Sequence, residues 1–283
     1  MLVVVVPGRG PLSSPYTRTV SDPAPPAKPW FDQVAADYGS VEFFHRFGEA
    51  LVAYAEIGPG AVIADVACGR GACLLPALEA AGAGSRVIGV DLSGGMLAGL
   101  AADLDDRGLP RRLARMDAQR LGLASSCSDV VLCGLALHLT ADPSAVLMEA
   151  HRVLRTGGVV ALSLPAPPTR SSLGPYFAVL ERFERQVPRP RAPDLDVAGL
   201  LAAAGFEAVE QRHAEVHLPI ADGPAFLHME RSHGYRAFFD ALGSQLARAF
   251  EEEATEALEE IRARDGGLWL DRGAALWRAR RPG

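Results

Sequence analysis

The sequence predicts an α/β protein with a doubly wound, mostly parallel sheet, and three observations lead to this class. An apolar segment, residues 61–66, ends in the turn Cys68-Gly69-Arg70-Gly71 and precedes an Ala/Leu-rich helical stretch. A second apolar segment ends in Asp91, twenty residues after Gly71. Strand-length apolar runs then alternate with helical patterns as far as residue 164. Such alternation is typical of βαβ units with parallel strands.

Composition narrows the class of protein. The chain has 283 residues, of which 49% are hydrophobic and 22% are charged, as in a globular protein with a core. The formal net charge of −6 argues against a nucleic-acid partner. No apolar stretch approaches the length of a membrane span, and the apolar start, residues 1–6, is too short for a signal peptide. We therefore expect a cytoplasmic protein that does not bind a membrane.

The four cysteines give no sign of a metal site. None has convincing zinc-ligand spacing, and a reduced state is the simple expectation. The cysteines are Cys68, Cys73, Cys127 and Cys133. His213 and His217 are spaced to share one face of a strand, but no third ligand accompanies them, so we expect no metal.

The first elements precede the glycine turn. Seven prolines in residues 7–29 predict that residues 1–29 form a disordered arm, with one domain at 30–283. Phe31, Ala35 and Tyr38 have helical spacing, which predicts a helix over residues 30–38. A second helix is expected at 41–57.

The glycine turn is expected to bind a ligand through its backbone, because glycine leaves no Cβ in the way. Asp65 lies at the end of the first strand, where a carboxylate repels a pyrophosphate and attracts a cation. Asp91, at the end of the second strand, is placed to accept from the two hydroxyls of a ribose. A cation-binding acid, a glycine turn and a ribose acid together favour S-adenosylmethionine over a dinucleotide.

The next elements follow in order. Pro76 requires that the helix after Gly71 either begins near Cys73 or is kinked. Ser93 is a good N-cap for a helix that ends near residue 107. Strands are expected at 113–116, which precedes Asp117, at 128–133 and at 159–164. A helix at 143–154 is expected to end at the glycines of 157–158.

The C-terminal part is predicted to be mainly helical. Helices are expected at 173–186, 196–205 and across 222–263, with a Pro-rich linker at 188–193. A strand at 206–218 and a last, edge strand at 274–280 complete the sheet. Two segments, 166–204 and 219–265, are candidate helical caps over a substrate.

Residues 31–164 resemble a class I S-adenosylmethionine-dependent methyltransferase of the small-molecule, ubiquinone/menaquinone-methyltransferase type. The matching motifs begin with Phe31-Asp-x-x-Ala-x-x-Tyr38 and the set Asp65, Gly69, Gly71 and Asp91. They continue with Leu137-His138, Asp142-Pro143 and Arg152-Val-Leu-Arg-x-Gly-Gly158. The chain departs from the family pattern at Leu139, which replaces a second histidine.

The resemblance implies a Rossmann-like, doubly wound, seven-stranded sheet whose last strand is antiparallel, with an inserted helical cap. It implies methyl transfer from S-adenosylmethionine, giving S-adenosylhomocysteine, to an O, N or C atom of a small organic acceptor, in keeping with specialised metabolism. The residues expected to bind the cofactor are Tyr38, Asp65, Ala67, Gly69, Gly71, Asp91, Leu92, Met96, Asp117, Ala118, Gly134 and Leu135.

Methyl transfer needs little acid–base chemistry, because the sulfonium methyl is already activated. His138, just after the fourth strand, is the candidate general base, and a hydrogen bond within its loop is the alternative role. The candidate acceptor-binding residues are Phe31, Tyr176, His228 and Tyr235. A homodimer through the inserted helices is compatible with the sequence.

Three alternatives remain at this point. A nicotinamide-dependent oxidoreductase would need a third glycine at position 74, which is Leu74. An amino-group-methylating DNA enzyme would need an Asn-Pro-Pro-aromatic run in place of Cys133-Gly-Leu-Ala. A protein that binds S-adenosylmethionine without transferring its methyl group is compatible with the sequence, because methyl transfer has no obligatory catalytic residue.

Overall fold

The computed structural model describes residues 4–7, 30–39, 41–82, 84–187, 194–232 and 235–283. Within these residues, no helix combines the length and apolar character needed to cross a membrane. The strands are β1 (Val4–Pro7), β2 (Val62–Val66), β3 (Arg86–Asp91), β4 (Leu113–Arg115), β5 (Ser128–Cys133), β6 (Leu154–Ala166), β7 (Glu207–Ile220) and β8 (Leu268–Arg280). The helices are α1 (Trp30–Tyr38), α2 (Glu42–Ala55), α3 (Leu74–Ala81), α4 (Gly94–Asp106), α5 (Pro143–Val153), α6 (Gly174–Glu184), α7 (Val197–Ala203), α8 (Gly223–Ser232) and α9 (Arg236–Asp265), with a short 3₁₀ helix at Leu137–Leu139.

The strands form one sheet in the order β1-β7-β8-β6-β5-β2-β3-β4. β3, β2, β5 and β6 are joined by parallel pairings, as are β3 and β4, and β8 is antiparallel. Apart from β1, this is the order of a Rossmann-like methyltransferase sheet, and the predicted fold class is confirmed. The parallel strands β2 and β5 are neighbours although β3 and β4 come between them in sequence, so the direction of winding reverses between them.

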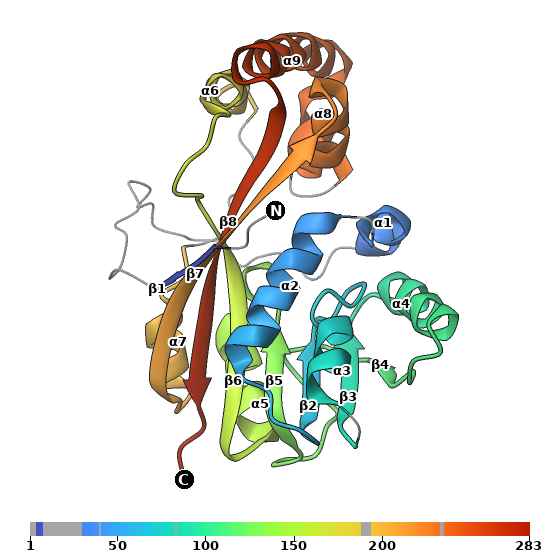
Figure 1. The fold of residues 1–283 in the computed structure, drawn as a ribbon, viewed down its shortest axis with the longest axis vertical. Coiled ribbons are helices and arrows are strands. Elements are labelled where there is room, and N and C mark those ends of the chain that lie inside the picture. Colours follow the sequence, from blue (N-terminus) through green and yellow to red (C-terminus); the bar gives the residue numbers. More distant parts are fainter. Residues whose placement is uncertain (1–3, 8–29, 40, 83, 188–193, 233–234) are drawn as a thin grey trace. The chain divides into compact units, whose positions relative to one another are not determined.

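The chain divides into two compact units. Unit 2 comprises residues 4–166, 192–214 and 274–283 and contains the parallel strands. Of the described residues, unit 1 takes those within 167–187 and 215–273 and contains α6, α8 and α9, which Figure 1 draws close together. The division falls within β7 and β8. The predicted cap segments, 166–204 and 219–265, overlap unit 1, but α7 belongs to unit 2; their role as a cap stays a prediction.

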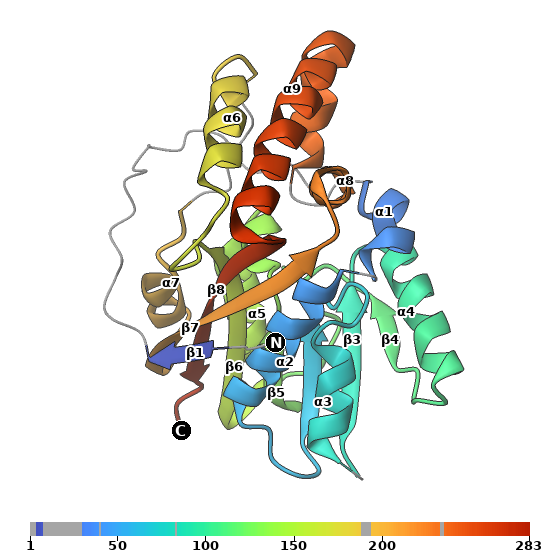
Figure 2. The same cartoon turned by 45° about the horizontal axis from the view of Figure 1, so that its top comes forward.

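Helices cover both faces of the unit 2 sheet, as Figures 1 and 2 show. α2 and α3 lie on one face, and α5 and α7 lie on the other. The core against α5 is built from the apolar strand residues and from Leu147, Val153 and Leu201, which are fully buried. Strands that are covered on both sides read as continuous apolar runs, which is why β2 and β5 were recognisable in the sequence.

Local signals explain where several helices begin. α3 begins at Leu74, so Pro76 lies in its first turn and needs no kink. Ser93 caps α4 by accepting a hydrogen bond from the Met96 amide, and Asp142 caps α5 through the Ala145 amide. The Ser93 cap was predicted from the sequence; for α3 a kink at Pro76 was the open alternative, and Asp142 was not predicted to be a cap.

Two predictions were wrong, one about how a helix ends and one about where a strand lies in the sheet. The helix expected at 143–154 ends at Val153, where Leu154 is already extended and begins β6, so the glycines do not terminate it. Gly157, with φ +77°, lies within β6, near a shift in the register of the β5–β6 pairing. The strand expected at the edge, 274–280, is part of β8, which begins at Leu268 and lies between β6 and β7. Pairing partners are non-local, so the last strand in sequence need not be the last in the sheet.

The predicted N-terminal arm is described only in part. Val4–Pro7 forms β1 at one end of the strand order, a strand where we expected none. Residues 1–3 and 8–29 of the arm, and the expected linker at 188–193, lie outside the described residues.

Candidate functional site

A cavity of about 450 Å³ lies in unit 2, at the carboxyl ends of β2 to β5 and beside α1 and α2. It adjoins the point between β2 and β5 at which the winding reverses, where open α/β sheets bind their ligands. Ten of the twelve residues predicted to bind the cofactor line it, as does Phe31. The ten are Tyr38, Ala67, Gly69, Asp91, Leu92, Met96, Asp117, Ala118, Gly134 and Leu135.

The backbone is strained where the two central strands meet the cavity. Ala67 follows β2 with φ +57°, and Leu135 follows β5 with φ +48°, in a region that favours glycine. The Leu135 amide donates to the Ser163 carbonyl and hydroxyl, at 3.1 and 3.0 Å, which holds the conformation. Strain of this kind collects at binding sites, because the surroundings must over-determine it. The cavity therefore has a preorganised backbone at both of its central strand ends.

The carboxylate of Asp91 joins the glycine turn to the start of α4. Its Oδ2 accepts from the Gly69 amide at 2.8 Å, and its Oδ1 accepts from the Ser93 amide at 2.8 Å. Burial raises the pKa of Asp91, while these amides act in the opposite direction. Each carboxylate oxygen keeps capacity for a second donor, so Asp91 can accept from a pair of neighbouring hydroxyls.

Asp65 is 1% exposed, and within the described residues neither carboxylate oxygen makes a hydrogen bond of good geometry, although the backbone amide of Leu74 lies close enough to act against the rise in its pKa. Burial, together with the nearby Asp91, raises its pKa well above the usual value. Burying an acid with so little compensation is costly, which makes Asp65 a candidate for pairing with a cationic ligand. Asp65 does not line the cavity directly; Cys68 and Cys73 do.

Gly71 is the other predicted binding residue outside the cavity wall. A Cβ at Gly71, whose φ is +84°, would lie 2.6 Å from the Leu100 side chain on α4. Gly71 therefore allows α4 to pack against the turn. At Gly69, with φ +52°, a Cβ would meet nothing within 4 Å, so the space beside that residue is open.

Asp117, after β4, forms a third acidic position on the cavity wall. Its Oδ1 accepts from the amide of Gln119 at 2.9 Å and from the Gln119 side chain at 3.1 Å. The side chain of Leu92 is 37% exposed on the wall, whereas Met96 is fully buried beneath it. An exposed leucine beside an acid suits a flat, polar-edged group such as a nucleobase.

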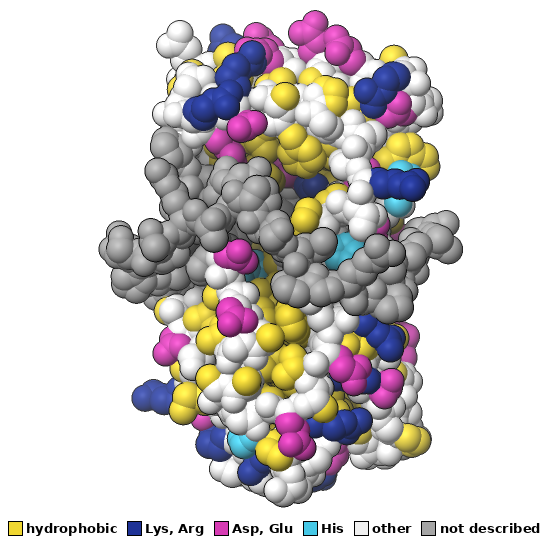
Figure 3. Space-filling model, turned by 90° about the vertical axis from the view of Figure 1, so that its left-hand side faces the viewer, with side chains coloured by type: hydrophobic (Ala, Val, Ile, Leu, Met, Phe, Trp, Pro, Cys, Tyr) yellow, Lys and Arg dark blue, Asp and Glu magenta, His cyan; other side chains and the backbone are white. Residues whose placement is uncertain are grey.

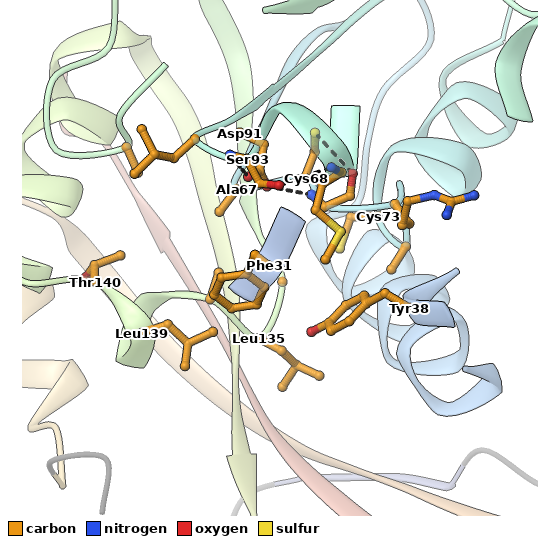
Figure 4. Close-up of a pocket in the computed structure, with 18 of the residues that line it drawn as sticks. Phe31, Tyr38, Ala67, Cys68, Cys73, Asp91, Ser93, Leu135, Leu139 and Thr140 are labelled. Atoms are coloured by element: carbon orange, nitrogen blue, oxygen red, sulfur yellow. Dashed lines mark hydrogen bonds between the residues drawn. The ribbon is translucent and has the colours of Figure 1, made fainter. Parts of the chain in front are cut away.

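Aromatic side chains gather on another part of the wall. Tyr38 stacks on Phe44, with ring centroids 4.5 Å apart, and meets Phe31 edge to face at 6.4 Å. Figure 4 shows Phe31, Tyr38, Leu135 and Leu139 together, on the side of the cavity away from Asp91. Leu139 is 40% exposed. This part of the cavity is suited to an apolar, flat molecule.

Two histidines lie near the cavity, and only one of them lines it. His138, the predicted base, is not part of the wall; its Nδ1 is buried with no hydrogen-bond partner among the described residues, and burial lowers its pKa to about 4. Its role as a base stays a prediction. His45 of α2 does line the wall, and its Nε2 lies 2.9 Å from the Gly39 carbonyl. Because a carbonyl only accepts, Nε2 carries the proton and Nδ1 is the basic nitrogen.

The other predicted acceptor-binding residues belong to unit 1. Tyr176 is fully buried in its core, in edge-to-face contact with Phe226 at 4.9 Å. His228 is exposed on α8, and Tyr235 precedes α9 and is half-buried. The structure therefore gives Tyr176 a packing role within unit 1, and the binding role of these residues stays a prediction.

Among the cavity residues that the sequence analysis missed are His45, Arg70 and Asp32. Arg70 occupies the variable position of the glycine turn, and Asp32 lies next to Phe31 in a recognised motif. The motifs therefore pointed at both positions. Nothing local marked His45, whose place on the wall depends on how α2 packs against the turn.

The side chains of the site do not favour metal binding or chemistry that needs a thiolate. Among the described residues, no group of three or more His, Cys, Asp or Glu side chains is arranged to hold a metal ion. Burial raises the pKa of the Cys68 and Cys73 thiols, so they are protonated at neutral pH. On the face shown in Figure 3, Arg side chains are interspersed with Asp and Glu side chains.

Comparison with known proteins identifies the family. Residues 64–162 match the model of a methyltransferase domain. The chain is 33% identical over 174 residues to the aklanonic acid methyltransferase DauC of Streptomyces sp. (strain C5), covering 57% of this chain and 78% of that protein. It is 29% identical over 258 residues to the nocamycin O-methyltransferase of Saccharothrix syringae, covering 84% of this chain and 91% of that protein.

Solved structures share the fold at low sequence identity. The YcgJ protein of Bacillus subtilis superposes with a TM-score of 0.56 at 16% identity, covering 84% of this chain and 99% of that one. The [4+2]-cyclase SpnF superposes with a TM-score of 0.54 at 19% identity, covering 94% and 99%. At this identity the likeness shows the fold alone.

Proposed function

Because this chain belongs to the S-adenosylmethionine-dependent methyltransferases that act on small molecules, we propose that it methylates an oxygen atom of an apolar specialised metabolite. The observation that carries the proposal is the division of one cavity into an acidic part, around Asp91, and an aromatic part, around Phe31 and Tyr38. The likeness to nocamycin O-methyltransferase, over most of that protein's length, supports an oxygen acceptor.

The residues of the acidic part fit the cofactor. Asp91 would accept from the ribose hydroxyls, and Asp117 from the adenine amino group. The buried Asp65 would place negative charge behind the glycine turn when a cationic cofactor is bound. When bound, S-adenosylmethionine supplies a methyl group already activated by the positive sulfur, so the chain's task is to align the acceptor and exclude water.

The aromatic part would hold the acceptor. Phe31, Tyr38 and Phe44 offer flat apolar surfaces, and Leu135 and Leu139 also line this part. Tyr38 and Leu135, which the sequence analysis assigned to the cofactor, would contact the acceptor instead. The two cations on the wall are already engaged: Arg70 binds the Ala35 carbonyl and Asp103, and Arg115 binds the Leu92 carbonyl. An apolar body with a reactive oxygen fits this lining better than a highly charged acceptor.

An acceptor hydroxyl must lose its proton during the transfer. His45 is the cavity-lining histidine with a defined basic nitrogen, Nδ1, and we assign it the role of base where the acceptor needs one. His138, predicted for this role from the sequence, is the alternative. An acidic acceptor, such as a carboxylic acid or an acidic phenol, needs neither residue.

The proposal is tested by incubating the protein with S-adenosylmethionine carrying a ¹³C-labelled methyl group and a panel of phenols, enols, carboxylic acids and amines of similar size. Release of S-adenosylhomocysteine identifies acceptors, and the carbon shift of the labelled methyl identifies the atom to which it is bound. We expect an oxygen-bound methyl on an apolar acceptor. Transfer only to nitrogen or carbon would refute the oxygen assignment.

A further inference from the structure

Helix α1 forms part of the cavity wall and is held there by contacts at both ends. Phe31, Asp32 and Tyr38 line the cavity, while Val34 and Ala35 are buried against Met96 of α4. The helix is only nine residues long, so packing and specific contacts must hold it in place rather than its own stability.

The first contact lies at the start of α1. Asp32 Oδ1 accepts from the Ser93 hydroxyl at 2.6 Å and from the Gly95 amide at 2.8 Å. These hydrogen bonds lower the pKa of Asp32, so it is ionised at neutral pH. Its charge lies at the N-terminus of α4, which favours an anion. A Cβ at Gly95 would come within 3.0 Å of the Asp32 backbone, so Gly95 allows this close approach.

The second contact lies in the last turn of α1 and depends on Arg70. The guanidinium donates from Nη1 to the Ala35 carbonyl at 2.5 Å and from Nη2 to Asp103 Oδ2 of α4 at 2.6 Å. A cation is favourable at the C-terminus of a helix, where carbonyls lack partners. Gly39 and Gly99 leave room for the guanidinium, because a Cβ at either would lie about 3 Å from it.

Both contacts involve residues at or next to the two amides that donate to the Asp91 carboxylate. Ser93, which holds Asp32, also donates its amide to Asp91, and Arg70 follows Gly69, which donates to the other Asp91 oxygen. We infer that Arg70 is a positioning residue that fastens α1 over the cofactor cavity, and that the Arg70–Asp103 pair controls how fast the cofactor enters and leaves. The inference rests on the cavity being the cofactor site.

Asp103→Asn tests the inference, because Asp103 binds Arg70 but does not line the cavity. Asp105→Asn is the matched control, since Asp105 lies on the same helix and pairs with Arg111 on the exposed surface. Association and dissociation rates of S-adenosylhomocysteine are measured by stopped flow on the full chain. In Asp103→Asn both rates should rise by about two- to fivefold, the upper part of the range for a partly exposed ion pair, with little change in Kd.

A rise in both the association and the dissociation rate distinguishes a positioning role from a direct contact with the ligand. Loss of a direct binding contact would raise the dissociation rate and Kd together and leave the association rate unchanged. Hydrogen exchange should also quicken in residues 34–38 of Asp103→Asn and not of Asp105→Asn. Arg70→Lys, which keeps the charge but not the two-sided fork, should show the same pattern.

Two results would overturn the inference. One is identical rates in Asp103→Asn and Asp105→Asn, and the other is a rise in the dissociation rate alone. If the wild type itself fails to bind S-adenosylhomocysteine, the assignment of the cavity to the cofactor fails instead. Acceptor chemistry does not enter these measurements, so the inference is tested separately from the oxygen acceptor.

Discussion

Asp65 shows how single residues of the site balance binding against stability. Its pKa is raised by burial and by Asp91, so at neutral pH folding must either protonate this carboxylate or bury its charge. For a group whose folded pKa is raised, stability is fully present below the ordinary pKa and is lost as pH rises towards the raised value. A bound cation would relieve this cost.

We predict that Asp65→Asn makes the ligand-free protein more stable at pH 7 and weakens its affinity for S-adenosylmethionine. Urea unfolding and calorimetric titration measure the two effects, with the exposed Asp106→Asn as the control. The loss should be smaller for S-adenosylhomocysteine, which lacks the sulfonium charge. Unchanged affinity for both ligands would show that Asp65 serves packing alone.

His138 provides a pH-dependent test. Its pKa falls to about 4 through burial, below the usual 6.5, so the unfolded chain binds a proton more readily than the folded chain. The resulting stability is present above pH 6.5 and is lost as pH falls towards 4, in total roughly 3 kcal/mol at 1.36 kcal/mol per pKa unit.

In His138→Gln the fall in stability between pH 6.5 and 4 should be shallower by an amount of that order. Urea unfolding at a series of pH values measures the difference between the two proteins, which cancels the contribution of other titrating groups. Parallel curves for the variant and the wild type would show that His138 is accessible to protons in the folded state.

At the residue scale, the sequence could predict the site residues that directly follow a recognisable strand. Gly69, Asp91 and Asp117 follow recognisable strands, so the common edge of a parallel sheet brings them together. The placement of His45 and Arg70 could not be predicted, because it depends on the packing of α1, α2 and α4. His138 has the opposite problem, since its position in sequence beside Leu139 does not reveal which side chain faces the cavity.

At the scale of elements, the packing of α2 on the glycine turn fixes the shape of the cavity. A Cβ at Gly48 of α2 would lie 1.9 Å from the carbonyl oxygen of Ala72, which is backbone and cannot move aside cheaply. Ala72 and Gly48 both line the cavity. This glycine therefore allows the close contact between α2 and the turn.

We predict that Gly48→Ala lowers the free energy of unfolding by about 1–3 kcal/mol, the usual cost of overpacking, although alanine favours helix by about 1 kcal/mol. It should also weaken S-adenosylhomocysteine binding. Gly94→Ala is the control, because a Cβ at Gly94 of α4 meets nothing within 4 Å. Equal stability of the two variants in urea would contradict the close packing of α2 on the turn.

The bounds of helices could be predicted where a local signal marks them. The prediction failed where strand pairing determines where an element ends or lies in the sheet. Helix starts at Ser93 and Asp142 follow from side-chain caps. The end of α5 at Val153 was misplaced, because Leu154 already pairs with Ser128 of β5, and a sheet contact outweighs the glycine signal at 157–158. The interior place of β8 had no local signature at all.

At the scale of the whole molecule, the two units have separate cores. Unit 1 packs α6 against α9 and α8 against α9 around Tyr176, Phe226 and Phe250, which are fully buried. Ion pairs such as Arg182–Glu253 and Arg231–Glu251 lie on its surface. The described residues that line the cavity all belong to unit 2. The sequence analysis expected one domain at 30–283 with two cap segments and did not predict a second unit with its own core.

The central claim is that the cavity of unit 2, organised by Asp91, is the S-adenosylmethionine site. Calorimetric titration of the full chain with S-adenosylhomocysteine and NADH, on wild type, Asp91→Asn and the exposed control Asp106→Asn, tests it most directly. We predict one S-adenosylhomocysteine per chain in the wild type and the control, a loss of binding in Asp91→Asn with the fold retained by circular dichroism, and no response to NADH. Equal binding by Asp91→Asn, or binding of NADH instead, would contradict the account.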